Sequence, residues 1–240
     1  MKNIVPASAG LLLALFGAAQ AHAQATCSSD RQARPAAVLE RFISADCEAC
    51  WGDQATPAPS AQSGTVVLDW IVPGAAGEDA PLSAAATNDA LARLQALRRP
   101  VPTRTDVYAA TTTDAPAPGM LRVAHGQPFN DYLGTAISLS PPRGTAQRSA
   151  AEGPWSFYLL LVESVPAGTD GTAVPRNLVR NMLQGTWDQR NQLSKRELFG
   201  WKEIRPMRIP EGSRPERLRM VGWVQDTQGR VVAAAQSACR

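Results

Sequence analysis

The chain has 240 residues, 44% of them hydrophobic and 19% charged, so it can bury a sizeable core in one large or two small domains. Its formal net charge of +3 gives no global electrostatic case for binding nucleic acid. The only histidines are His22 and His125, and this scarcity excludes His-rich zinc sites. P-loop, Rossmann and G-x-S-x-G patterns are absent, so nothing points to a nucleotide-binding enzyme or an α/β-hydrolase.

The N-terminus has the order of a secretory signal peptide. Lys2 supplies a short basic region, residues 11–19 form an apolar run, and small-x-small cleavage sites end at Ala23 and Ala25. The apolar run is too short to cross a bilayer, and no later stretch is long and apolar enough to be a membrane span. We therefore predict that residues 1–25 are a signal peptide. The mature protein is predicted to be periplasmic or secreted, in a compartment where disulfides persist.

The first half of the mature chain alternates strand and helix patterns. Short apolar runs bounded by turn residues predict strands over 36–44, 65–73, 104–110 and 120–126. Between the second and third of these strands, leucines at helical spacing predict a helix over residues 82–99. This alternation predicts a small α/β domain over residues 34–128.

Beyond about residue 128 the pattern changes to strands separated by turn signals. The strand-like segments are YLGTAISLS (132–140), WSFYLLLVES (155–164), RLRMVGWVQD (217–226) and RVVAAAQS (230–237). One segment, VPRNLVRNMLQG (174–185), has apolar residues at helical spacing and is predicted to be a helix. The pattern predicts a β-rich, sandwich-like domain over residues 129–240.

Two cysteines, Cys47 and Cys50, follow directly after the predicted strand 36–44. If a helix begins there, its N-terminal dipole stabilises a Cys47 thiolate, although Glu48 works against this. Cys47 would then attack a substrate disulfide, and Cys50 would resolve the mixed disulfide. The spacing predicts a thiol–disulfide oxidoreductase that needs no cofactor. Its partners would be the thiols or disulfides of exported proteins.

A resemblance to a known family starts at this pair. VLERFISADCEACW (38–51) resembles the opening of the secreted bacterial thioredoxin-like family called "domain of unknown function twelve-twenty-three", relatives of a Bacteroidetes outer-membrane protein family. The likeness continues in VVLDWIVPG (66–74), RNLVRNMLQGTW (176–187) and VGWVQDTQGRVVAAAQ (221–236), so it covers most of the mature chain. It implies a fold of the α/β plus β class, in which a thioredoxin-like domain is followed by a β-rich domain.

The resemblance also implies a role for a proline. Thioredoxin-like proteins keep a cis-proline before the strand that faces the cysteines, and Pro118 is the nearest candidate in this chain. The implied catalytic residues are then Cys47, Cys50 and Pro118. The chain departs from the family directly after the second cysteine, where Trp51 stands in place of a proline.

Two other interpretations of the cysteine pair stay open. In an oxidising compartment Cys47 and Cys50 can form an inert disulfide, and the protein would then be a non-catalytic secreted binding or structural module. Alternatively, Cys47, Cys50 and His125 could hold copper, because two soft sulfurs and one imidazole suit that metal.

Counting the cysteines predicts a second disulfide. If Cys47 pairs with Cys50, then Cys27 is left with Cys239. Such a bond would tie down two ends of the mature chain, where termini otherwise fray. The alternative is that Cys27 is free or forms a bond between molecules.

Overall fold

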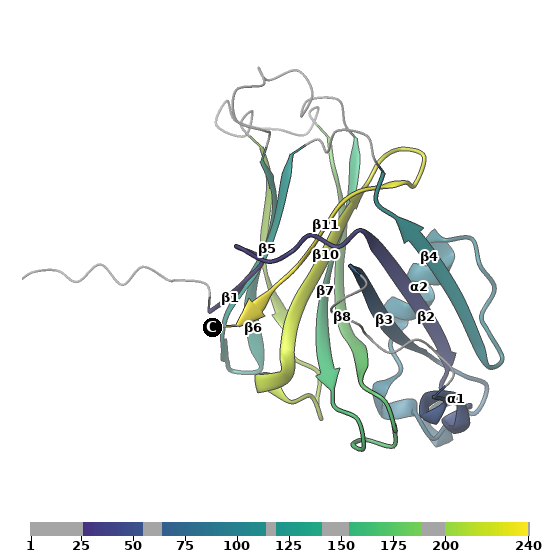
Figure 1. The fold of residues 1–240 in the computed structure, drawn as a ribbon. Coiled ribbons are helices and arrows are strands. Elements are labelled where there is room, and N and C mark those ends of the chain that lie inside the picture. The colour runs from purple at the N-terminus through teal and green to yellow at the C-terminus, as the bar shows by residue number, and fades with distance from the viewer. Residues whose placement is uncertain (1–25, 55–63, 114–118, 141–153, 189–199, 240) are drawn as a thin grey trace, which may run out of the picture.

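Two β-sheets packed face to face form the body of the protein (Figure 1). The computed structural model describes residues 26–54, 64–113, 119–140, 154–188 and 200–239. The predicted signal peptide, residues 1–25, and Pro118 lie outside these residues. Within the described ranges, no helix is long and apolar enough to cross a bilayer.

The smaller sheet has five antiparallel strands in the order β12-β1-β5-β6-β9. Their bounds are Cys27–Ser28 (β1), Met120–Phe129 (β5), Tyr132–Ser140 (β6), Trp201–Arg208 (β9) and Ala238–Cys239 (β12). Asn130 and Asp131 connect β5 to β6 with positive φ at both residues, as a two-residue hairpin turn of this kind requires. The last strand, β9, carries exposed Lys202, Arg205 and Pro206, and such residues discourage edge pairing with another chain.

The larger sheet has seven strands in the order β11-β10-β7-β8-β3-β2-β4. Their bounds are Ala37–Ser44 (β2), Thr65–Val72 (β3), Thr105–Thr111 (β4), Trp155–Val165 (β7), Arg176–Trp187 (β8), Leu218–Gln225 (β10) and Val231–Gln236 (β11). The pairs β2–β3 and β3–β8 are parallel, and the other pairs are antiparallel. The α-helices are short, α1 at Glu48–Gly52 and α2 at Asn88–Ala96.

The main hydrophobic core lies between the two sheets. It includes fully buried Ile137 from the smaller sheet and Leu159 from the larger one. Aromatic rings stack through it: the centroids of Phe157 and Trp187 are 4.6 Å apart, and those of Trp187 and Trp201 are 6.2 Å apart. These separations are typical of favourable aromatic pairs, so the rings help to hold the two sheets together.

A second hydrophobic cluster covers the other face of the larger sheet. Leu94 of α2 packs there with Phe42 and its neighbours on the strands. Arg93 of α2 is buried in the same place because it pairs with Glu40, with Nη2 and Oε1 2.6 Å apart, and lies 4.4 Å from the centre of the Tyr158 ring. The central strand β3 is buried along nearly its whole length, and its buried residues are apolar apart from Asp69.

The helix predicted over residues 82–99 is confirmed over a shorter span. Thr87 is the N-cap of α2, and its hydroxyl accepts a hydrogen bond from the backbone N–H of Ala90 at 3.2 Å. The residues before the cap form a separate 3₁₀ turn at Ser83–Ala85. A cap therefore sets the start of the helix inside the predicted range.

The predicted α/β plus β fold class, with a thioredoxin-like domain, is wrong. The described part of the chain is mostly β, with 53% of its residues in strands and 13% in helices. Residues 37–44 and 65–72 do lie side by side as parallel strands, but β3 also pairs with β8 on its other edge. Each sheet contains strands from both sides of residue 128. A thioredoxin-like sheet needs helices over both faces. Here the smaller sheet covers part of one face instead.

The helix predicted over residues 174–185 is also wrong, because this segment forms β8. The strand has a β-bulge at Arg180, which the register of the β7–β8 pairing skips. The bulge reverses the alternation of side chains along the strand. As a result Val179 and Met182, three residues apart, both reach the cluster beneath α2 and imitate helical spacing.

Buried polar side chains connect β3 to β8 in the middle of the larger sheet. β3 and β8 share a single register pair, Asp69 with Leu178. Asp69 Oδ2 accepts a hydrogen bond from the Asn177 backbone N–H at 3.0 Å, and the Asn177 side chain donates to the Val67 backbone oxygen at 2.7 Å. Arg41 of β2 donates through Nε to Asp69 Oδ1 at 2.7 Å, and both side chains are fully buried. Hydrogen bonds between side chains and the backbone therefore connect β3 to β8, where backbone pairing is limited to one register pair.

The close approach of the two sheets at Gly222 predicts a loss of stability on substitution. A Cβ at this position of β10 would lie 2.8 Å from Val123 Cγ1 and 3.0 Å from the backbone oxygen of Tyr158. We expect Gly222→Ala to lower the free energy of unfolding by about 1–3 kcal/mol, because neighbouring strands must move. Gly134→Ala is the matched control on β6, where a Cβ meets no atom within 4 Å. It should change stability by about 0.5 kcal/mol at most in urea unfolding, and equal losses in both variants would contradict the prediction.

Candidate functional site

The two cysteines predicted to be redox-active form a buried disulfide at the end of β2. Cys47 directly precedes α1 and Cys50 lies within it. Only 9% of Cys47 and 5% of Cys50 are exposed. Ile43 of β2, Ile71 of β3 and Trp51 of α1 belong to the same apolar cluster. The bond therefore lies inside a small hydrophobic core and not in an open cleft.

Trp51, the residue after the pair, connects α1 to the loop between β7 and β8. Its indole N–H donates a hydrogen bond to the Asp170 backbone oxygen at 2.7 Å. The Arg176 guanidinium donates to the backbone oxygens of Trp51, at 3.2 Å, and of Asp53. Its carbon lies 5.9 Å from the centre of the Trp51 ring, and burial lowers the pKa of Arg176. The disulfide holds the turn that presents Trp51 to these contacts.

The surroundings of Cys47 do not favour a reactive thiolate. α1 has only five residues, and Glu48 places a negative charge in its first turn. Reactive cysteines lie in electropositive, partly exposed environments, whereas this pair lies among apolar side chains. The predicted place of Pro118 beside the cysteines stays a prediction, because that residue lies outside the described part of the chain.

The other two cysteines are bonded in the smaller sheet. The Cys27–Cys239 disulfide joins residues that are 212 positions apart in the sequence. Cys27 of β1 lies opposite Cys239 of β12 on one side and opposite His125 of β5 on the other. This pairing is the one that the cysteine count leads us to expect, and it connects the first described strand to the last.

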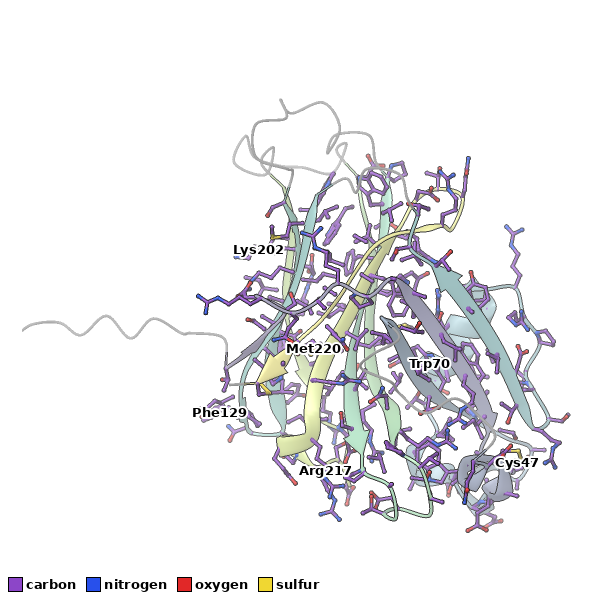
Figure 2. All side chains as sticks on the ribbon, viewed as in Figure 1. Cys47, Trp70, Phe129, Lys202, Arg217 and Met220 are labelled. Atoms are coloured by element: carbon purple, nitrogen blue, oxygen red, sulfur yellow. A yellow bond between two sulfur atoms is a disulfide. The ribbon has the colours of Figure 1, made fainter. Side chains whose placement is uncertain are left out.

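His125 lies beside this second disulfide, away from the C-x-x-C pair. A ring nitrogen of His125 and the sulfurs of Cys27 and Cys239 lie within 4.8 Å of one another. Figure 2 shows Phe129, at the end of the same strand as His125, on the opposite side of the molecule from Cys47. The predicted copper set of Cys47, Cys50 and His125 is therefore not brought together. The physical reason is that the two groups lie in different sheets. His125 is on β5 of the smaller sheet, whereas the C-x-x-C pair packs against β2 and β3 of the larger sheet.

The hydrogen bonding of His125 distinguishes its two ring nitrogens. Nδ1 lies 2.7 Å from the Gly126 backbone oxygen. A carbonyl can only accept, so Nδ1 carries a proton and the neutral ring has its lone pair on Nε2. Nε2 is buried and has no hydrogen-bond partner among the described residues. Buried polar atoms usually have a partner, and Nε2 is one of several buried side-chain atoms in the described residues that lack one, together with four tryptophan Nε1 atoms.

No sequence pattern indicated that Cys27, His125 and Cys239 form a group. These residues meet only because β1 pairs with both β12 and β5, and β1 and β12 have two residues each. Strands this short leave no apolar periodicity to detect. The usable signals were the cysteine count and the position of His125 in a predicted strand.

No protein-family model matches the chain, and no curated protein matches its sequence. The resemblance to the secreted family described above therefore stays a prediction that rests on its short motifs.

Proposed function

We propose that the protein is an exported, non-catalytic binding or structural module stabilised by two structural disulfides. The burial of the Cys47–Cys50 bond carries this proposal, since its cysteines are only 9% and 5% exposed within an apolar cluster. Thiol–disulfide exchange requires an attacking thiolate to reach a sulfur, so a covered pair is a poor catalyst. The contacts of Trp51 give the bond a structural purpose, because it fixes the turn from which those contacts are made.

Export is supported by two independent features. Residues 1–25 have the pattern of a signal peptide, and two disulfides are formed, as is usual in oxidising compartments.

A binding role is supported by the distribution of exposed apolar side chains. Six large apolar side chains are exposed among the described residues, and four of them belong to the smaller sheet: Met120, Phe129, Tyr132 and Ile204. Such exposure provides surface for a partner.

An insulin-reduction assay tests the absence of catalysis. We expect the mature protein to leave the rate of insulin reduction by a dithiol unchanged, because the dithiol cannot recycle a buried pair. The Cys47→Ser/Cys50→Ser variant should give the same rate, and a known oxidoreductase serves as the positive control. An acceleration by the wild-type protein that Cys47→Ser abolishes and Cys27→Ser leaves intact would overturn the proposal.

A further inference from the structure

We propose that reduction of the Cys27–Cys239 bond creates a binding site for copper(I), formed by the two sulfurs and His125 Nε2. The donor groups are already gathered, because the sulfurs and a ring nitrogen lie within 4.8 Å of one another. This site is separate from the C-x-x-C pair and does not depend on the proposed function.

The three residues are held in a row by the strand register. Cys27 occupies the middle strand, with Cys239 and His125 directly opposite on its two neighbours. Directly opposed residues of antiparallel strands have Cβ atoms about 4.5–5.5 Å apart, which is close enough for their side chains to share one ion. The strand pairing therefore brings the ligands together, and breaking the sulfur–sulfur bond frees two of them.

His125 has the bonding of a metal ligand. Histidines that bind metals usually donate the other ring N–H to a carboxylate or a backbone carbonyl, which fixes the ring and its tautomer. Here the Nδ1 group meets the Gly126 backbone oxygen at 2.7 Å. Nε2 keeps its lone pair, and within the described ranges no hydrogen-bond donor uses it. Only 5% of His125 is exposed, so bulk water does not readily satisfy that nitrogen.

The choice of copper(I) follows from the donors. Two thiolates and one imidazole form a soft set, which copper(I) prefers. Zinc is the main competitor, but it takes four ligands, and the described part of the chain gathers three here. Cys27 and His125 are buried and Cys239 is exposed, so a water molecule can reach the site as a fourth ligand only from the side of Cys239. Copper(I) is stable with three ligands.

The bonding state of the cysteines controls access to the site. An external dithiol supplies two electrons: the Cys27–Cys239 bond breaks, the dithiol becomes a disulfide, and its two protons pass to the freed sulfurs. Copper(I) then displaces these two protons and forms two copper–sulfur bonds. The oxidation state of copper does not change. The oxidised protein offers one imidazole and no thiolate, so it should not hold the ion.

A copper(I) titration tests the proposal in the Cys47→Ser/Cys50→Ser background, which leaves one reducible bond. The protein is reduced with a phosphine, desalted under anaerobic conditions and titrated against the copper(I) chelator bicinchoninate. We expect the reduced protein to bind one copper(I) per chain and the oxidised protein to bind none. His125→Asn should weaken binding about tenfold or more, since it removes one ligand and keeps both sulfurs. X-ray absorption should show two sulfur neighbours and one imidazole nitrogen.

Three outcomes would overturn the proposal: equal binding by the oxidised and reduced proteins, unchanged affinity in His125→Asn, or retention of zinc(II) in preference to copper(I). If reduction unfolds the metal-free protein, the melting temperature provides a second readout. Copper(I) should then raise the melting temperature of the reduced protein, because it binds only the folded state, and should not raise that of His125→Asn. An absence of this difference would likewise reject the site.

Discussion

Replacing Arg41 by methionine should lower the free energy of unfolding by about 3–5 kcal/mol near neutral pH, because it leaves the Asp69 carboxylate buried without its counter-charge. Both side chains are fully buried, so water cannot replace the lost partner. The same carboxylate accepts the Asn177 N–H that joins β3 to β8. The change therefore acts at the point where the backbone pairing of the larger sheet is weakest. Urea unfolding followed by circular dichroism measures the loss.

This loss should depend on pH. Burial raises the pKa of Asp69 in the folded protein, and the Arg41 guanidinium opposes that rise. Removing Arg41 therefore raises the folded pKa further above the unfolded value of about 4. A carboxyl with a raised folded pKa contributes its full stability below the unfolded pKa and loses it as pH rises through the folded pKa. The deficit of Arg41→Met relative to wild type should thus be smaller at about pH 5 than at about pH 8.

Two control variants make the explanation testable. Arg41→Met/Asp69→Asn removes both charges and keeps an oxygen for the Asn177 N–H, so it should recover most of the stability and lose the pH dependence. Arg230→Met breaks an ion pair with Asp226 in which the arginine is 61% exposed, and it should cost less than about 1 kcal/mol. A double variant as unstable as Arg41→Met would show that the unpaired charge is not the cause.

Removing the Cys27–Cys239 bond should also have a large effect. The bond closes a loop between residues 212 positions apart, and the chain-entropy model assigns about 5 kcal/mol to a loop of this size. We expect Cys27→Ser/Cys239→Ser to melt about 10–20 °C below the wild-type protein. Differential scanning calorimetry measures the shift, and non-reducing peptide mapping of the wild-type protein verifies the linkage.

The second disulfide provides the matched comparison. Cys47 and Cys50 are three positions apart, so their bond restricts the unfolded chain much less, by about 2 kcal/mol in the same model. Cys47→Ser/Cys50→Ser should therefore melt at a higher temperature than Cys27→Ser/Cys239→Ser. The reverse order would mean that packing around α1, and not loop closure, dominates the contribution of disulfides to stability.

Much of the strand content could be predicted from the sequence, but the arrangement of the strands could not. The run TVVLDWIV is apolar apart from Thr65 and Asp69 and is buried along nearly its whole length, and this marks β3 clearly. Its second neighbour depends on Asp69 and Asn177, polar residues whose pairing leaves no periodic signal. The charged Asp69 inside an apolar strand was the one sequence signal of a buried polar interaction at this position. The thioredoxin-like prediction rested on the family resemblance and on the alternation of strand and helix patterns, and neither reveals β8 as a neighbour of β3.

The candidate site was predictable to a similar extent. Counting four cysteines leads to Cys27 with Cys239 once the C-x-x-C pair is closed. It does not place His125, because a histidine joins a cysteine pair only through tertiary strand pairing. The position of Cys47 at the start of a helix was predicted, but burial decides its reactivity. Whether that thiol is covered depends on side chains contributed by β3 and β8, which are distant in the sequence.

The bond between β1 and β12 also determines how the protein responds to mechanical load. A force that pulls the segments before Cys27 and after Cys239 in opposite directions passes through one covalent bond, because β1 and β12 are adjacent. The two stacked sheets lie inside the loop that this bond closes, so their hydrogen bonds carry almost none of the tension. Reduction would transfer the load to β1 and β12, which are only two residues long.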